Sequence, residues 1–391
     1  MIDASLSPWP SYDEDEINAV TSVLRSNKVN YWTGEECRLF EAEFASWAKT
    51  AKAIAVTNGT VALDLALNAL GIGPGDEVIV TPRTFIASAS CVVTAGAKPV
   101  FADIDIDSGN LSATTIERCI TSRTKAVIPV HLAGWPCDLD SIMELAKRYD
   151  FAVIEDCAQA HGAEIGGRPV GSIGHIGAWS FCQDKIMTTG GEGGMITTND
   201  DELWSKMWSY KDHGKSWDAV YNREHAPGYR WLHESFGTNW RMLEMQAAIG
   251  RLQLKKMQEW TARRTYIAER LAKALCAFPE IVRVPMPNAS VTHAYYRLYA
   301  YIQPENIASL WSRDRIIDEF CRNGLPVFQG SCSEVYLERA FEGTDFRPSQ
   351  RLPNALQLGQ TSLMFLTHPT ISDSELDGMC VAIDRVLRSI S

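Results

Sequence analysis

From about residue 50 onward, short apolar runs alternate with longer stretches whose apolar residues recur at helical spacing. This rhythm is typical of an α/β fold, in which strands and helices follow one another along the chain. Most of the runs are apolar almost throughout, which predicts a sheet that helices cover on both faces. The expected strands are 53–57, 77–81, 98–102, 126–130, 151–155, 178–181 and 195–198. The expected helices between them are 60–70, 86–95, 138–148 and 201–210.

The pattern breaks between residues 212 and 238, where glycine, aromatic and charged residues mix without a steady period. A loop of this length within a compact chain is usually functional or disordered. The aromatic content of this one favours an ordered lid or an interface segment. A long helix is then expected over 242–275, with Trp240 and Arg241 opening it.

A second α/β pattern follows the long helix, with an apolar run at 294–302 and a helical stretch at 314–323. A chain of 391 residues is long enough for two domains that share an extensive interface. We therefore expect a large domain over residues 1–250 and a smaller C-terminal α/β domain over residues 251–391.

Charge and cysteine content argue against several classes of protein. The 37 basic and 48 acidic residues give a net charge of -11 without any basic stripe, which argues against a nucleic-acid partner. The ten cysteines form no CxxC pair, so buried reduced thiols are expected rather than a zinc or redox site. The N-terminus lacks the pattern of a signal peptide, and no apolar run reaches the roughly 18 residues that span a bilayer. We expect a cytoplasmic protein without membrane association.

Asn58, Gly59 and Thr60 join an expected strand to an apolar helix. The first turn of such a helix presents free N–H groups and the positive end of the helix dipole, which together hold an anion such as phosphate. A hydroxyl in that turn adds a further donor. The alternative is that Asn58 or Thr60 only caps the helix.

Two acidic residues, Glu155 and Asp156, end the apolar strand FAVI. Ligands of α/β proteins bind at the carboxyl ends of strands. An aspartate held there can pair with a protonated ring nitrogen and keep the ring able to accept electrons. Metal binding, or carboxylates that are merely solvated, are the alternatives.

Lys185 lies in the loop after the run that ends at residue 181, and a glycine-dense turn, 190–194, follows it. Because glycines permit close backbone approach, a lysine in this setting can be desolvated enough to act as an amine nucleophile. The alternative is a solvated surface lysine.

No rival signature of catalysis is present in the sequence, which lacks GxxxxGK[ST], GxGxxG, HExxH and GxSxG motifs. The eight histidines show no spacing typical of metal ligands, so we expect no metal site. His131, at the end of an expected strand, and His161, close to Asp156, are secondary candidates for the site.

A series of segments resembles, in order and spacing, the sugar aminotransferases of the DegT/DnrJ/EryC1/StrS family over almost the whole chain. The segments are TGEECRLFEAEFA, TNGTVALDLAL, GPGDEVIVTPRTFIASA, GAKPVFADID, VHLAGWPCDLD, VIEDCAQAHGA, GAWSFCQDK, GGEGGMITTND, GTNWRMLEMQAAIGRLQL and THPTISDSEL. The resemblance implies the aspartate aminotransferase fold (fold type I) of pyridoxal-phosphate-dependent transferases. In that fold, a large domain with a mixed, mostly parallel seven-stranded sheet precedes a smaller C-terminal α/β domain. It also implies pyridoxal 5'-phosphate as cofactor, with pyridoxamine 5'-phosphate as its second form.

Carried over residue by residue, the resemblance gives catalytic roles to Lys185, which would hold the cofactor covalently, and to Asp156, which would pair with the pyridine nitrogen. Gln159 would hydrogen-bond the ring hydroxyl, and Phe85 would stack on the ring. The residues implied at the cofactor phosphate are Gly59, Thr60, Ser180 and, from the neighbouring subunit of a homodimer, Asn239. Those implied along the substrate cleft are Tyr31, Trp32 and the 212–238 segment.

The implied reaction transfers an amino group from glutamate to a keto-sugar, expected to be nucleotide-linked, in two half-reactions. Relatives with histidine in place of the lysine act as sugar 3-dehydratases, so Lys185 favours amino transfer. A sugar dehydratase, a pyridoxal-phosphate lyase, a desulfurase using Cys332 and a non-catalytic cofactor-binding regulator on the same fold remain alternatives. The stretch VFQGSCSEVYLERAF departs from the commonest substrate-loop pattern of the family, which leaves the sugar and its nucleotide open.

Overall fold

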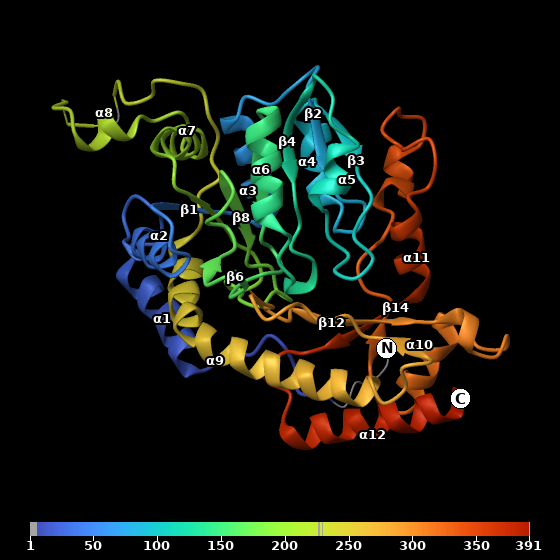
Figure 1. Cartoon of the computed structure of the whole chain (residues 1–391). Coiled ribbons are helices and arrows are strands. Elements are labelled where there is room, and N and C mark those ends of the chain that lie inside the picture. Colours follow the sequence, from blue (N-terminus) through green and yellow to red (C-terminus); the bar gives the residue numbers. More distant parts are fainter. Residues whose placement is uncertain (1–5, 226, 229, 391) are drawn as a thin grey trace.

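A seven-stranded sheet forms the centre of the larger part of the molecule (Figure 1). The computed structural model describes residues 6–225, 227–228 and 230–390. Within the sheet, β9 runs opposite in direction to all the other strands, so the sheet is mixed and mostly parallel, as expected. The strands are, in spatial order, β1 (Lys52–Val56), β9 (Gly194–Thr198), β8 (Ile176–Ser180), β5 (Ala152–Asp156), β4 (Thr124–Ile128), β2 (Glu77–Val80) and β3 (Lys98–Phe101).

Successive side chains along the strands enter two separate cores, because alternate residues of a strand point to opposite faces. Val78 and Val80 pack into the core that α3, α4 and α7 cover. Ile79, Val127 and Val153 pack into the core that α5 and α6 cover. The predicted sheet with helices on both faces is therefore confirmed. The helices are α3 (Gly59–Ala69), α4 (Ala87–Thr94), α5 (Ala113–Glu117), α6 (Leu139–Tyr149) and α7 (Asp201–Lys211).

Each strand and helix expected in this part of the chain begins and ends within two residues of its predicted bounds. The long helix α9 (Glu244–Leu275) differs at its start, since Trp240 and Arg241 do not open it. The N–H of Trp240 donates to the carbonyl of Lys211 at 3.0 Å, and its own carbonyl accepts from the N–H of Thr57 at 3.1 Å. These bonds hold the segment extended beside β1, so the helix begins later.

A second sheet of four antiparallel strands forms the centre of the smaller part. Two helices and the C-terminal half of α9 pack against it in one apolar core. The strands are, in spatial order, β10 (Val282–Arg283), β12 (Arg297–Ile302), β14 (Ser362–Leu366) and β13 (Val327–Phe328), and the helices are α10 (Arg313–Arg322) and α12 (Asp373–Ile390). A further ribbon consists of β11 (Val291–Thr292), β6 (Glu164–Ile165) and β7 (Arg168–Pro169).

The chain passes between the two parts more than once. The expected boundary at residue 250 falls within α9, which packs against α1 (Glu14–Ser26) and α2 (Glu36–Trp47) and also against α12. Beyond β13 the chain returns to the first sheet before α11 (Pro353–Thr361), and three of its side chains join that sheet's core. They are Val335, Tyr336 and Phe341.

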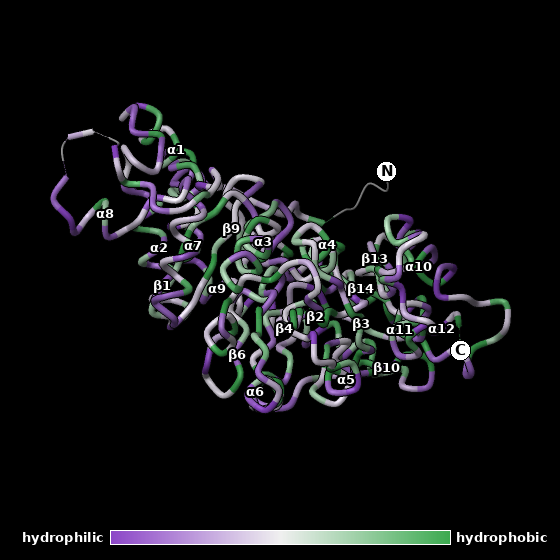
Figure 2. Tube along the Cα trace, turned by 90° about the horizontal axis from the view of Figure 1, so that it is seen from above, coloured by the Kyte–Doolittle hydropathy of each residue, from purple (hydrophilic) through white to green (hydrophobic). Residues whose placement is uncertain are grey.

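The described residues of the 212–238 segment lie at the periphery of the molecule and contain one short helix, α8 (Trp217–Tyr221), seen at the edge of the body in Figures 1 and 2. The expectation of irregular backbone therefore needs correction at α8, whose first turn is capped by the hydroxyl of Ser216. Trp231 and Phe236 are 89% and 99% exposed.

None of the helices in the described residues is long and apolar enough to cross a membrane.

Candidate active site

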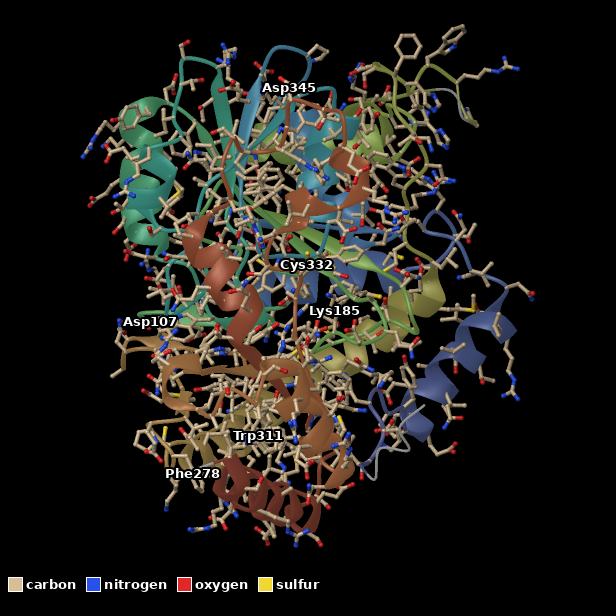
Figure 3. All side chains as sticks on the ribbon, turned by 90° about the vertical axis from the view of Figure 1, so that its right-hand side faces the viewer. Asp107, Lys185, Phe278, Trp311, Cys332 and Asp345 are labelled. Atoms are coloured by element: carbon tan, nitrogen blue, oxygen red, sulfur yellow. The ribbon has the colours of Figure 1, made fainter. Side chains whose placement is uncertain are left out.

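A cavity of about 750 Å³ lies where the carboxyl ends of β5 and β8 meet the second sheet. Figure 3 places Lys185 in the middle of the molecule, above the part that carries Trp311 and Phe278. The carboxyl ends of strands are the usual ligand sites of open α/β sheets. Seven residues predicted from the sequence line this cavity, namely Gly59, Thr60, Phe85, Asp156, Gln159, Ser180 and Lys185.

The turn into α3 forms an anion cradle on one wall of the cavity. Asn58 caps the helix by accepting from the N–H of Val61 at 2.9 Å. The N–H groups of Gly59 and Thr60 find no acceptor among the described residues. A Cβ on Gly59 would lie 2.6 Å from the Cβ of Ser180, so only glycine lets the end of β8 approach this closely. The capping and anion-binding interpretations are therefore compatible.

Asp156 is the last residue of β5 and is 6% exposed. One carboxylate oxygen accepts from the hydroxyl of Ser88 at 2.7 Å, and the other accepts from the N–H of Ala158 at 3.1 Å. Among the described residues no cationic side chain pairs with it. A buried carboxylate held in this way is ready to accept a cationic group of a ligand.

Phe85 and Gln159 offer two further contacts to a flat ring. Phe85 lies on the cavity wall and is 68% exposed. One face of its ring is therefore available to stack on the ring of a ligand. The side-chain oxygen of Gln159 accepts from the N–H of Ala133 at 2.8 Å. Its amide nitrogen is thus the group left to donate to a ligand.

Lys185 is fixed through its backbone, while its amine faces the cavity. Its N–H donates to the carbonyl of Cys182 at 3.1 Å, and its carbonyl accepts from the indole N–H of Trp9 at 2.9 Å. Its Nζ lies 5.3 Å from the ring centroid of Tyr296. Among the described residues no carboxylate forms an ion pair with this amine. The amine is therefore available to a ligand.

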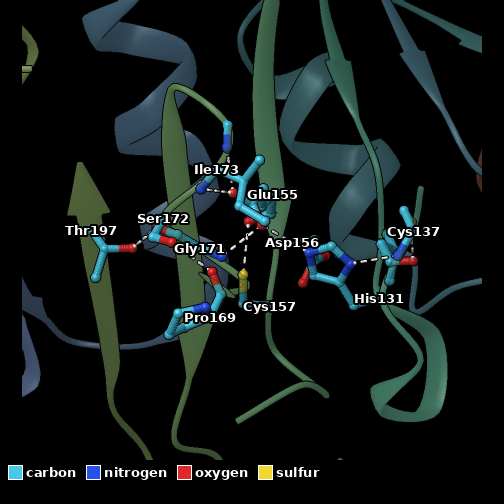
Figure 4. Close-up of polar contacts among 12 residues, drawn as sticks. His131, Cys137, Glu155, Asp156, Cys157, Pro169, Gly171, Ser172, Ile173 and Thr197 are labelled. Atoms are coloured by element: carbon cyan, nitrogen blue, oxygen red, sulfur yellow. Dashed lines mark hydrogen bonds and ion pairs between the residues drawn. The ribbon is translucent and has the colours of Figure 1, made fainter. Parts of the chain in front are cut away.

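The neighbouring Glu155 belongs to a structural network, shown in Figure 4. Its carboxylate accepts from the N–H groups of Gly171, Ile173 and Gly174 at 2.6, 2.9 and 2.5 Å, and it lies 3.0 Å from Nε2 of His131. Because the N–H of Cys137 donates to Nδ1 of His131, Nε2 carries the proton. Adjacent residues of a strand point to opposite faces, so Glu155 braces the loop after β7 while Asp156 lines the cavity.

The secondary histidine candidates do not enter the cavity. His131, Glu155 and Cys157 form a buried grouping of metal-ligand types, but hydrogen bonds already engage His131 and Glu155. His161 is fully buried, with ring centroids of Trp179 and Phe181 at 5.1 and 5.6 Å. Burial, followed by the charges of Lys185 and Arg264, lowers the pKa of His161 to about 3, which keeps the ring neutral.

Three predicted residues lie away from this cavity within the chain. Tyr31 is fully buried, with its hydroxyl 3.2 Å from both Glu41 and the indole nitrogen of Trp208. Trp32 borders a separate cavity of about 330 Å³ next to the 212–238 segment. Asn239 pairs with Asp212 in an isolated antiparallel bridge.

Cys332, the thiol considered for a desulfurase, does not line the cavity, although Gly330 and Ser331 do. Burial raises the pKa of its thiol, which disfavours the nucleophilic thiolate. Its backbone carbonyl accepts from the N–H of Thr84 at 3.1 Å and so ties this loop to the first sheet.

The second sheet supplies cavity residues that the sequence argument did not identify, namely Tyr296, Arg297, Tyr299 and Met364. The strand β12, which carries Arg297 and Tyr299, was expected from the apolar run at 294–302, whereas β14, which carries Met364, was not expected. The run alone does not indicate which end of the strand meets a cavity formed by distant parts of the chain. Aromatic and basic side chains at the start of a strand, YYRLY, were the available signal.

The amine after β8, the carboxylate at the end of β5 and the helix N-terminus after β1 define an enzyme of the aspartate aminotransferase fold. The family model of the DegT/DnrJ/EryC1/StrS aminotransferase family matches residues 10–384, and the chain belongs to this family.

Three relatives show how far the similarity extends. The chain is 39% identical over 353 residues to GDP-perosamine synthase of Caulobacter vibrioides, covering 89% of each chain. An X-ray structure of an aminotransferase from Psychrobacter cryohalolentis is 61% identical, with a TM-score of 0.97 and coverage of 98% of this chain and 99% of that one. The S. venezuelae protein DesV, solved in complex with a ketimine intermediate, is 31% identical, with a TM-score of 0.86 and coverage of 96% and 95%.

Proposed function

We propose that this protein is a pyridoxal 5'-phosphate-dependent aminotransferase that moves an amino group from glutamate to a keto-sugar carried on a nucleotide. The observation that carries the proposal is that the amine of Lys185, the buried carboxylate of Asp156 and the free N–H groups of α3 surround one cavity. This set of groups matches the aldehyde, ring nitrogen and phosphate of the cofactor.

The residues present fit the cofactor at both of its ends. Gly59 and Thr60 would hold the phosphate with N–H groups that have no other acceptor among the described residues, and the hydroxyl of Ser180 would add a donor. Asp156, which has no cationic partner there, would pair with the protonated ring nitrogen. Phe85 would stack on the ring, whose hydroxyl Gln159 would contact. Lys185 would be joined to the aldehyde carbon.

When bound, the cofactor supplies an electron sink for the negative charge that develops on the substrate carbon. The amine of Lys185 would act as base and acid and would move a proton from the α-carbon of the donor. Asp156 keeps the ring nitrogen protonated throughout, and Ser88 holds the carboxylate in place. The reverse sequence then delivers the amine to the keto group of the sugar.

The nature of the acceptor rests on the cavity and on a relative's name. A volume of about 750 Å³ leaves room beside a cofactor, in the range of about 300–1,000 Å³ common for ligand sites. The hydroxyls of Tyr299 and Ser331 on its walls suit a polyhydroxylated substrate. GDP-perosamine synthase, by its name, forms a nucleotide-linked amino sugar.

We also propose that the protein works as a homodimer whose partner completes the site. Trp231 and Phe236 leave large apolar surfaces exposed, which a second copy would cover. Asn239 would then reach the cofactor phosphate of the partner. Trp32 and the 212–238 segment would border the partner's substrate cleft, with Tyr31 supporting the Trp32 ring at a centroid distance of 5.8 Å.

The visible spectrum tests this proposal. Purified protein loaded with pyridoxal 5'-phosphate should lose its aldehyde-form absorbance on addition of glutamate and release 2-oxoglutarate, and a nucleotide-linked keto-sugar should restore the absorbance. Lys185→Ala should not cycle, whereas Lys206→Ala should, because Lys206 is an exposed residue paired with Glu202. Wild-type cycling by Lys185→Ala, or release of ammonia or a dehydrated sugar instead of amine exchange, would contradict the proposal.

A further inference from the structure

The charges around the cavity are unevenly divided. Its lining includes three acidic residues, Asp156, Asp184 and Glu192, and two basic ones, Lys185 and Arg297. In the proposed function, which this inference builds upon, the amine of Lys185 is committed to the cofactor. Arg297 is then the one permanent cation among the described residues that line the cavity.

Arg297 is held from one side and keeps donors for a ligand. It is the first residue of β12, and its side chain is 11% exposed. Nη1 donates to the carbonyl of Tyr296 at 2.8 Å, and the guanidinium lies 4.0 Å from the Tyr296 ring centroid. Nη2 is 3.6 Å from Asp184, which is an ion-pair distance but longer than a hydrogen bond. The guanidinium of Arg297 is thus oriented by stacking on the Tyr296 ring, and its ion pair with Asp184 is weak.

Asp184 is a partner that a ligand can replace. Its side chain is 58% exposed, so water can solvate its carboxylate when Arg297 turns to another anion. The hydroxyl of Tyr296 also donates to Asp184. Although burial raises the pKa of Asp184, the charge of Lys185, the Tyr296 hydrogen bond and the charge of Arg297 outweigh burial and lower it. The carboxylate is therefore ionised and keeps Arg297 neutralised in the absence of ligand.

We infer that Arg297 binds a carboxylate of the amino donor, and that Asp184 is the resting partner which this carboxylate displaces. Lys185 and Arg297 both lie on the Tyr296 ring, at 5.3 and 4.0 Å from its centroid. A donor whose amine takes the place of the lysine amine brings its carboxylates into this neighbourhood. The planar fork of arginine binds a carboxylate through two parallel hydrogen bonds.

The diphosphate of a nucleotide sugar is the other anion that could enter. Two linked phosphates require several cationic or N–H donors, whereas this wall of the cavity offers a single guanidinium beside an acidic residue. The cavity's other N–H donors, at the start of α3, are assigned to the cofactor phosphate. The structure therefore assigns Arg297 to the donor rather than to the diphosphate.

The test separates the two half-reactions of the holoenzyme. Glutamate converts the aldehyde form to the amine form, and the dependence of this spectral change on glutamate concentration gives a dissociation constant. Arg297→Gln should raise that constant at least tenfold, and Arg297→Lys should raise it less, because the charge remains while the fork is lost. Binding of glutarate, a dicarboxylate without an amine, measured by calorimetry should weaken in parallel. Asp184→Asn should tighten glutamate binding, because the donor's carboxylate then has no charged partner of Arg297 to displace.

The control is Arg283→Gln, which removes an arginine from the same sheet. Arg283 pairs with Asp107 outside the cavity and should leave both measurements unchanged. Unchanged glutamate and glutarate binding in Arg297→Gln would overturn the inference. So would a variant that binds glutamate normally but loses affinity for a nucleotide-linked keto-sugar in the second half-reaction. If glutamate does not change the spectrum of the wild-type holoenzyme, the proposed function is contradicted and the role of Arg297 is not. Glutarate binding to the wild type and to Arg297→Gln then still tests whether Arg297 binds a carboxylate.

Discussion

The indole N–H of Trp9 donates a hydrogen bond of 2.9 Å to the backbone carbonyl of Lys185, across 176 residues of sequence. Trp9 itself is packed edge-on against Trp260 at a centroid distance of 5.1 Å. The N-terminal segment therefore reaches under the active-site loop and fixes the backbone of the residue whose amine faces the cavity.

We predict that Trp9→Phe lowers kcat by about three- to tenfold, because it keeps an aromatic ring but removes a hydrogen bond worth about 0.5–1.5 kcal/mol. Steady-state kinetics with glutamate check this prediction. Trp260→Phe is the matched control, since Trp260 supports Trp9 without bonding to Lys185. An equal loss of kcat in the two variants would show that the packing of Trp9, rather than its hydrogen bond to Lys185, positions the active-site loop.

Gly59→Ala should weaken cofactor binding at least tenfold, because the new methyl group would lie 2.6 Å from the Cβ of Ser180 and push the cradle apart. Titration of the apoprotein with pyridoxal 5'-phosphate, followed by absorbance, measures the effect. Gly378→Ala, within α12 and with open space around the added methyl group, should bind the cofactor normally. Normal binding by Gly59→Ala would mean that the cradle can shift.

Glu155→Gln should destabilise the fold without altering the chemistry of the site directly. Its carboxylate accepts from three backbone N–H groups and from His131, and an amide would turn an N–H₂ group toward donors. We expect a loss of about 2–4 kcal/mol in the free energy of unfolding. Urea denaturation measures it, with Glu202→Gln on the surface as control. A change below about 0.5 kcal/mol, the usual range for surface substitutions, would contradict the structural role.

Acid should destabilise the protein partly through His161, whose pKa in the folded state is about 3 against an ordinary value of 6.5. Below pH 6.5 the unfolded chain binds a proton that the folded state refuses, so stability falls as the pH falls toward 3. At pH 5 this contribution amounts to about 2 kcal/mol, at about 1.4 kcal/mol for each pH unit.

His161→Phe keeps an aromatic ring in place but cannot titrate. Its free energy of unfolding should therefore fall by about 2 kcal/mol less than that of the wild type between pH 8 and pH 5. Chemical denaturation of both proteins at the two pH values gives the comparison. Identical pH dependence in the two proteins would show that His161 gains a partner or becomes hydrated.

The sequence predicted the elements of the first sheet well because its strands are buried on both faces and read as continuous apolar runs. It also predicted the residues around Lys185 and Asp156, since each follows such a run and the resemblance assigned their roles. The apolar run alone did not separate Glu155 from Asp156, because only the alternation of the strand decides which carboxylate reaches the cavity. The resemblance made that choice, and it named Asp156. Arg297 was missed because its proximity to Lys185 depends on how two distant sheets meet.

The most direct test of the account is to locate the covalent attachment of the cofactor. Holoenzyme treated with borohydride and digested should give a single modified peptide, carrying reduced pyridoxal phosphate on Lys185, by mass spectrometry. Modification of another lysine, or an unmodified protein that still transfers amino groups, would contradict the assignment of Lys185 as the residue around which this site is formed.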